Sequence, residues 1–179
     1  MPRYVALLQG INVGKHNRIA MADLRALVER LGHTEVKTHL NSGNVVFTAA
    51  SGANEEHAKQ IEDAISRELG LEVPVVVRSG EDLARIVAGN PFPEAAADHT
   101  TLHVTFLGGA PDPERVAALA EADHGDDDYR VVGADVYLFY PHKLSWATFM
   151  PTGLGKALGV VATSRNWRTV TRLAEMAAR

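Results

Sequence analysis

The sequence contains no cysteine in its 179 residues. This absence excludes disulfides, thiol nucleophiles, iron–sulfur ligation and cysteine-based zinc sites together. It is typical of a protein from a reducing compartment. The apolar stretch Val5–Leu8 near the N-terminus is too short for the apolar region of a signal peptide. We therefore expect a cytoplasmic protein.

The sequence also lacks the patterns of several common functional classes. No stretch approaches the roughly 20 apolar residues that span a bilayer, so we expect no membrane partner. The eight histidines are scattered without a His-Glu-x-x-His motif, and the acidic run Asp123–Asp128 lacks the ligand spacing of an EF-hand. No Gly-x-Ser-x-Gly elbow is present for a serine nucleophile. The sequence thus predicts no metal and no cofactor, and it assigns no catalytic residue.

Hydrophobic residues make up 46% of the chain and charged residues 22%, which is the composition of an ordinary globular protein. The net charge of −4 is divided unevenly. Residues 1–50 hold 6 Lys/Arg and 3 Asp/Glu, residues 51–128 hold 5 and 17, and residues 129–179 hold 7 and 2. This pattern predicts a basic surface if the two ends meet, although helix surfaces that merely differ in composition would explain it equally well.

The first half of the chain predicts a complete βαββαβ arrangement. Apolar residues at helical spacing indicate helices over 21–31 and 54–69. Short apolar runs indicate strands over 4–8, 36–40, 45–48 and 73–78. The turn-forming cluster Asn41–Asn44 joins the second and third of these strands as a hairpin. This order is that of a ferredoxin-like unit.

The second half predicts a similar order after a connecting helix over 81–88. We expect a strand over 102–107, a helix over 113–122, a hairpin of 129–132 with 136–140, and a final helix over 165–178. The sequence therefore predicts an α+β fold with two ferredoxin-like βαββα units in tandem, whose antiparallel sheets carry helices on one face. We place the units at residues 1–80 and 101–179, with a connection over 81–100, packed as one compact protein. The pattern does not decide whether the units share a sheet.

The loop after the first strand, Gln9–Arg18, combines glycines, amides and positive charge. Gly14 permits unusual backbone angles, Asn12 and Asn17 offer hydrogen-bonding amides, and Lys15 supplies positive charge. These residue types suit a ligand-binding loop. A long connection between a strand and a helix needs the same residues simply to turn.

Two further polar motifs are candidates for the same site. Ser42, Gly43 and Asn44 form the expected hairpin turn, which tight-turn chemistry alone also explains. Arg165, Asn166 and Trp167 lie where we expect the last helix to begin, with Thr163 or Ser164 as its cap. Arginines in a first turn oppose the helix dipole, and a bound anion would reverse that effect. Alternatively, Arg165 pairs with a carboxylate and Trp167 is a core residue.

Three motifs together resemble a known bacterial family, domain of unknown function 1697. They are Gly10–Gly14, Ser42–Phe47 and Thr163–Trp167, and the resemblance spans essentially the whole chain. It implies two ferredoxin-like units in tandem and no established activity. Members often carry Arg where this chain has Gln9, and Gly where it has Lys15.

The leading hypothesis is a protein that binds a small anionic ligand, phosphate- or nucleotide-like, at a basic, glycine-lined site. The expected ligand contacts are Asn12, Gly14, Lys15, Asn17, Ser42, Gly43, Asn44, Arg165, Asn166 and Trp167. A second hypothesis is nucleic-acid binding, with Tyr4, Tyr137 and Phe139 presented on the sheets. A third is an enzyme acting on a phosphorylated metabolite, and a fourth is an interaction module with exposed strand edges. The oligomeric state is left open.

Overall fold

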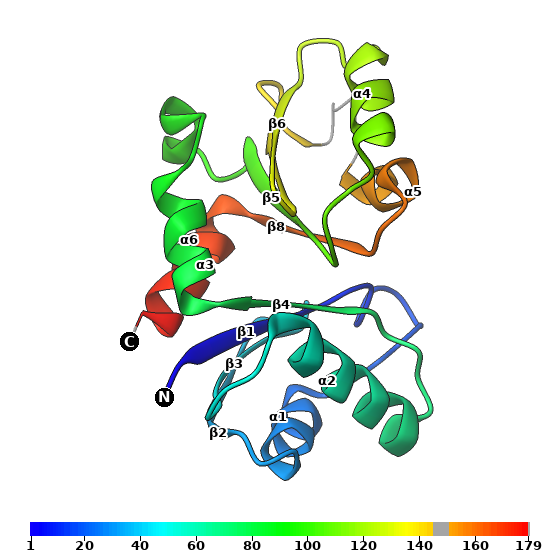
Figure 1. Cartoon of the computed structure of the whole chain (residues 1–179), viewed down its shortest axis with the longest axis vertical. Coiled ribbons are helices and arrows are strands. Elements are labelled where there is room, and N and C mark those ends of the chain that lie inside the picture. Colours follow the sequence, from blue (N-terminus) through cyan, green and yellow to red (C-terminus); the bar gives the residue numbers. More distant parts are fainter. Residues whose placement is uncertain (145–150, 179) are drawn as a thin grey trace. The chain divides into compact units, whose positions relative to one another are not determined.

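The protein forms two compact units in a computed structural model that describes residues 1–144 and 151–178 (Figure 1). The first unit comprises Met1–Ile86 and Leu173–Arg179, and the second comprises Val87–Arg172. The division at Ile86 falls within the segment expected to connect the units. Each unit has its own four-stranded antiparallel sheet. The predicted α+β class with two ferredoxin-like units is therefore confirmed, and a sheet shared by both units is excluded.

The first unit has the strand order β2-β3-β1-β4, with helices α1 and α2 covering one face of the sheet (Figure 1). Its strands are β1 (Arg3–Leu8), β2 (Thr34–His39), β3 (Asn44–Thr48) and β4 (Val75–Ser79). Its helices are α1 (Met21–Arg30), α2 (Asn54–Leu69) and α3 (Gly80–Ala88), of which the last runs into the second unit. Each predicted element of this unit is present, with ends that shift by one or two residues.

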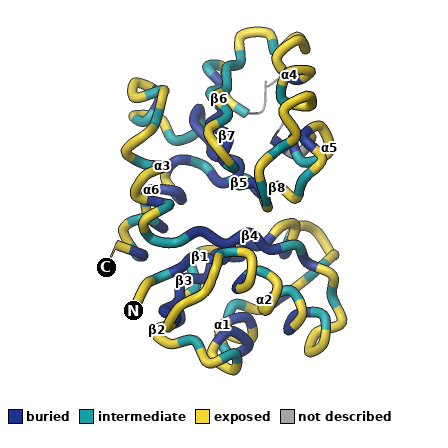
Figure 2. Tube along the Cα trace, in the orientation of Figure 1, coloured by how far each residue is buried: buried dark blue, intermediate teal, exposed yellow. Residues whose placement is uncertain are grey.

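Both faces of the first sheet are buried along its inner strand β1. Tyr4, Ala6 and Leu8 pack with the helices in one core, while the intervening Val5 and Leu7 are also fully buried. Because successive side chains point to opposite faces, such a strand reads as an unbroken apolar run. Strand β2, by contrast, is largely exposed (Figure 2). Its pairing with β3 shifts in register between Thr34 and Lys37. A short, irregular edge strand resists pairing with another chain.

The second unit repeats this topology with the order β6-β7-β5-β8. Its strands are β5 (Leu102–Leu107), β6 (Asp128–Val132), β7 (Asp135–Phe139) and β8 (Ala162–Asn166). Its helices are η1 (Pro93–Ala97), α4 (Pro113–Glu121), η3 (Pro151–Gly153), α5 (Leu154–Leu158) and the beginning of α6 (Trp167–Ala177). Buried residues of α4 and α5 form one core with the sheet.

The prediction that the final helix begins at about Arg165 was wrong, because residues 162–166 form strand β8 and the helix begins only at Trp167. The segment reads Ala-Thr-Ser-Arg-Asn, which carries no alternation of apolar and polar residues. Pairing with β5 along its whole length decides the conformation. Neither Thr163 nor Ser164 caps the helix; the side-chain oxygen of Asn166 accepts a hydrogen bond from the Thr169 amide at 2.9 Å.

Candidate functional site

The loop after β1 is organised by the side chain of Asn12. Its Nδ2 donates to Ile19 O at 2.9 Å and to Asn41 O at 2.8 Å, while its Oδ1 accepts from Ile19 N at 2.9 Å. Its backbone amide donates to Asn17 O. Both Asn12 and Asn17 have left-handed backbone angles, with φ of 56° and 49°, which asparagine tolerates better than most residues. A single side chain therefore closes the loop and joins it to the hairpin turn.

The hairpin turn between β2 and β3 packs closely against the same loop. A side chain on Gly43, whose φ is +89°, would place its Cβ 2.7 Å from Ile11 Cδ1 and 2.9 Å from Leu8 Cβ. Only glycine fits there, because both the space and the backbone angle exclude a side chain. Asn44 is fully buried, and its Nδ2 donates to His39 O at 2.7 Å and Ser42 Oγ at 3.1 Å. Gly43 and Asn44 thus shape the turn from within.

The first two predicted motifs therefore meet in the first unit. Around the Asn12–Asn41 contact lies a polar surface, which we call the loop–turn surface, made by the exposed residues Gly14, Lys15, His16, Arg18 and Ser42. Asn17 is half-buried beside them. Five of the seven predicted contacts in these two motifs are at least partly accessible, namely Asn12, Gly14, Lys15, Asn17 and Ser42.

The third predicted motif lies in the second unit and has a different structure from the one expected. Arg165 is on strand β8, where its Nη1 donates to Thr163 Oγ1 at 2.7 Å and to Ser164 O at 2.8 Å. Burial lowers the pKa of Arg165 to about 10. Asn166 caps α6, and Trp167 is buried, as its core interpretation predicted. Their expected contact with a ligand stays a prediction.

Sequence reasoning missed a counterpart of Arg165 in the first unit, at Arg78. Arg165 pairs with Val104, the third residue of β5, and Arg78 pairs with Val5, the third residue of β1. Both arginines are 8% exposed, and Nη1 of each donates to the carbonyl of the preceding residue. The sequence signal that could have revealed this pair is a shared spacing. Arg78 is followed by Ser79, with Asp82 three residues after Ser79, and Arg165 is followed by Asn166, with Thr169 three residues after Asn166.

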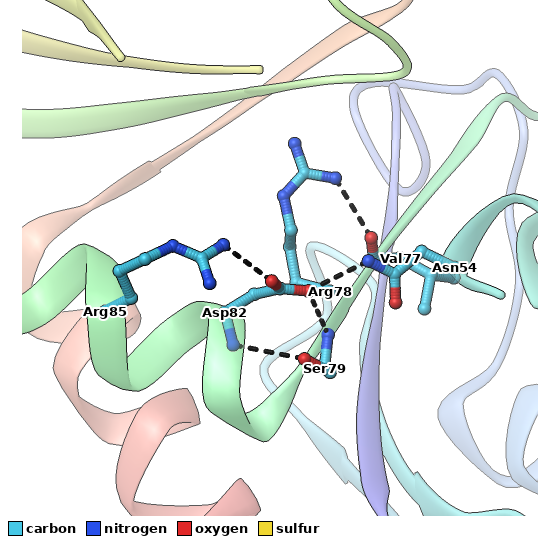
Figure 3. A network of polar contacts seen from close by, with 6 residues as sticks. All are labelled: Asn54, Val77, Arg78, Ser79, Asp82 and Arg85. Atoms are coloured by element: carbon cyan, nitrogen blue, oxygen red, sulfur yellow. Dashed lines mark hydrogen bonds and ion pairs between the residues drawn. The ribbon is translucent and has the colours of Figure 1, made fainter. Parts of the chain in front are cut away.

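The junction after Arg78 contains a network of polar contacts (Figure 3). Ser79 and Asp82 form a reciprocal capping box: Asp82 N donates to Ser79 Oγ at 3.1 Å, and Ser79 N donates to Asp82 Oδ2 at 2.9 Å. Asn54 Nδ2, at the start of α2, and Arg85 Nη2 also donate to the Asp82 carboxylate. Burial alone would raise the pKa of Asp82, but these hydrogen bonds outweigh it and lower the pKa to about 2. The network fixes the starts of two helices.

The first unit also contains a pocket of about 400 Å³ at the junction of β1, β4, α3 and the end of α6. It is lined by Pro2, Arg3, Tyr4, Ser79, Gly80, Glu81, Ala84, Ala177 and Ala178. Arg3 is engaged at its wall, because Nη1 donates to Met176 O and Nη2 to Glu35 Oε2, both at 3.0 Å. Hydrogen bonds from Thr48 and Arg3 lower the pKa of Glu35. None of the expected anion contacts lines this pocket.

The aromatic residues expected to stack on nucleic-acid bases are mostly inside the protein. Tyr4 is 6% exposed and belongs to the core under α1 and α2, and Tyr137 is 2% exposed. Phe139 is half-buried and stacks on Phe92, with ring centroids 5.5 Å apart. Nucleic-acid binding stays a prediction, but two of its three expected rings are not on the surface.

Residues 1–144 and 151–178 were compared with the arrangements typical of metal sites and of membrane-spanning helices. Among these residues, no group of three or more histidine and acidic side chains is arranged to hold a metal ion. Within the same part of the chain, no helix has the length and apolar character needed to cross a bilayer.

Comparison with other proteins identifies the family but no activity. A solved structure, of a conserved bacterial protein from Streptococcus pneumoniae, superimposes with a TM-score of 0.74 over 98% of each chain at 21% identity, which shows a shared fold. No protein of curated function matches the sequence. The sequence pattern of the family described as protein of unknown function DUF1697 matches residues 1–137. The third motif, Thr163–Trp167, lies beyond the matched residues. The match covers more than half of the chain, which therefore belongs to the DUF1697 family, as the resemblance predicted.

Proposed function

We propose that this protein binds a small anionic ligand, of the phosphate or nucleotide kind, at the loop–turn surface of its first unit. The observation that carries the proposal is the closure of the loop by Asn12, which fixes Ile19 and Asn41 through three hydrogen bonds. The exposed Lys15 and Arg18 therefore project from a loop whose two ends are already held. Preorganisation of this kind reduces the entropy lost on binding.

The residues of the proposed site divide into two roles. Lys15 and Arg18 balance the charge of the ligand, while the Ser42 hydroxyl and the Asn17 amide, which are accessible or half-buried, orient it. Asn12, Gly43 and Asn44 act indirectly by holding the loop against the turn.

Titration calorimetry with inorganic pyrophosphate and with nucleoside mono- and diphosphates tests the proposal. Removing both cations in Lys15→Ala/Arg18→Ala should weaken binding about tenfold or more, since a hydrogen bond to a charged group contributes about 1.5–3 kcal/mol. Lys59→Ala/Arg67→Ala removes the same charge from exposed positions of α2 and is the matched control. Binding should also weaken as salt increases.

The result that would refute the proposal is equal weakening by both double variants, because then only net charge matters. Absence of binding by every anion tested would equally refute it. Binding of single-stranded RNA without binding of mononucleotides would instead favour the nucleic-acid hypothesis.

A further inference from the structure

Two histidines of the first unit lie in an aromatic cluster that takes no part in the proposed anion site. The cluster, called here the histidine cluster, consists of Tyr4 on β1, His33 before β2, Phe47 on β3 and His57 in the first turns of α2. The His57 ring centroid lies 4.4 Å from that of Tyr4, 5.2 Å from that of His33 and 5.5 Å from that of Phe47. Three of the four rings are almost completely buried.

Three ring nitrogens of this cluster are buried without a hydrogen-bond partner in the described part of the chain. They are both nitrogens of His57, which is only 3% exposed, and Nε2 of His33. Burial lowers the pKa of His57 and that of His33, and the charge of each ring would oppose that of the other. Buried polar groups without partners are rare in folded proteins, and each costs free energy that solvation would recover.

His57 is covered from outside by a short exposed segment, residues 50–53, which leads into α2. Its Gly52 lies directly against the ring: a Cβ on this residue would be 2.6 Å from His57 Nε2. The segment is held by a hydrogen bond from Tyr4 Oη to Gly52 O at 3.0 Å and by one from Ala53 N to Glu56 Oε2 at 3.3 Å. By contrast, Tyr4 and Phe47 are held in the sheet by the pairing of β1 with β3.

We propose that residues 50–53 form an acid-sensitive cover, and that proton uptake by His57 opens this segment with the first turn of α2 while the sheet stays folded. For water to reach the His57 ring, one of the residues packed against it must move away. Moving Gly52 breaks few contacts, whereas moving Tyr4 or Phe47 disrupts β1 or β3 along their paired lengths. Local openings follow the segment with the fewest buried contacts.

The charged and titratable groups around His57 agree with this direction. His33 opposes a charge on His57 from the adjoining turn, and Glu56 on α2 itself favours one. Tyr4 faces the ring from β1. The Asp82 network reaches α2 through the Asn54 amide, one turn before His57, and the pKa of the Asp82 carboxyl is lowered to about 2. Of these groups, the two histidines are the ones whose pKa burial lowers.

The linkage has a definite sign and an upper limit. The folded pKa of His57 lies below its ordinary value of 6.5, so the open form binds more protons and acidification favours it. A histidine that titrates normally when open raises the opening equilibrium by at most about tenfold between pH 7.5 and pH 5.5. Release of His33 in the same step would raise this limit to about a hundredfold.

Amide hydrogen exchange of the full chain, corrected for intrinsic rates, measures this opening peptide by peptide. We expect protection of residues 50–57 to fall at pH 5.5, by up to about tenfold, with β1 and β3 unchanged. The drop should disappear in His57→Gln. His103→Gln, which removes a buried histidine of the second unit whose pKa is lowered to about 4, should leave it intact.

Gly52→Ala provides a test that does not depend on the histidine variant folding well. The added methyl group collides with His57 Nε2, so residues 50–57 should exchange at pH 7.5 as the unchanged protein does at pH 5.5. Constant protection between the two pH values would overturn the proposal. A drop shared by the whole first unit, or one that persists in His57→Gln, would overturn it as well. Anion binding at the loop–turn surface is decided separately.

Discussion

The two units have the same strand order but different layers of helix. In the first unit the crossover before the fourth strand is α2, a helix of 16 residues; in the second it is α5, a helix of 5 residues that follows η3. Both sheets nevertheless have the order in which the first strand pairs with the third and the fourth. The comparison shows that pairing in the sheet, rather than helix length, defines this topology.

The junctions after the fourth strands also share one arrangement in the two units, but they are built from different residues. Each strand carries a buried arginine followed by a cap residue, Arg78-Ser79 in β4 and Arg165-Asn166 in β8. In the first unit a carboxylate, Asp82, returns a hydrogen bond to the cap residue, whereas Thr169 occupies its place in the second. The first junction should therefore respond to acid, and the second should not.

The largest expected effect comes from replacing one buried side chain in each of the two crossover helices, α2 and α5, by alanine. Ile61→Ala in α2 should lower the free energy of unfolding by about 4 kcal/mol, and Leu158→Ala in α5 by about 2–3 kcal/mol. Both side chains are buried, but a helix of five residues can move to fill a cavity more readily than the middle of a long one. Urea denaturation measures the difference. Gln60→Ala and Lys156→Ala, at exposed positions of the same helices, are controls. A larger loss for Leu158→Ala would show that α5 is the more rigid element.

The next effect distinguishes the two strand–helix junctions by pH. The folded pKa of Asp82 is about 2, below its ordinary 3.8, so its contribution of about 2 kcal/mol is complete above about pH 4 and is lost as pH falls through 2. Asp82→Asn should therefore destabilise the protein at pH 6 and much less at pH 2.5. Asn166→Ala should cost about 1 kcal/mol at both pH values. Equal pH dependence in the two variants would contradict the assignment of Asp82.

Sequence patterns predict the first unit well because the local periodicity of its apolar residues agrees with the packing and strand pairing that the fold imposes. Apolar periodicity alone places the α2 helix at Asn54–Leu69. In the second unit, β8 was missed because Ala162–Asn166 is polar and gains its conformation from pairing with β5. The α5 helix was missed because five residues carry too little periodicity to recognise.

The sequence was sufficient to identify which residues form the candidate site, but not what each of them does there. Turn chemistry and the motifs identified Asn12, Gly43 and Asn44, yet each of them acts on the protein itself. Hydrogen bonds such as Asn12 to Asn41 join residues far apart in the sequence, and local spacing does not reveal them. Arg78 was overlooked because an arginine at the end of a strand reads as an exposed charge, whereas the fold buries it.

The smallest expected effect compares the glycines that end the two crossover helices. Gly70 and Gly159 both have left-handed backbone angles, with φ of 65° and 71°, so alanine at either position should cost about 1 kcal/mol. A Cβ added at Gly70 would meet open space, whereas one added at Gly159 would lie 3.0 Å from Arg115 Nε. Gly159→Ala must therefore also displace Arg115, which donates weakly to the last carbonyls of α5. Thermal unfolding should show the larger loss for Gly159→Ala. Arg115→Ala combined with Gly159→Ala should remove the excess, and an unchanged difference would mean that the backbone angle alone sets the cost.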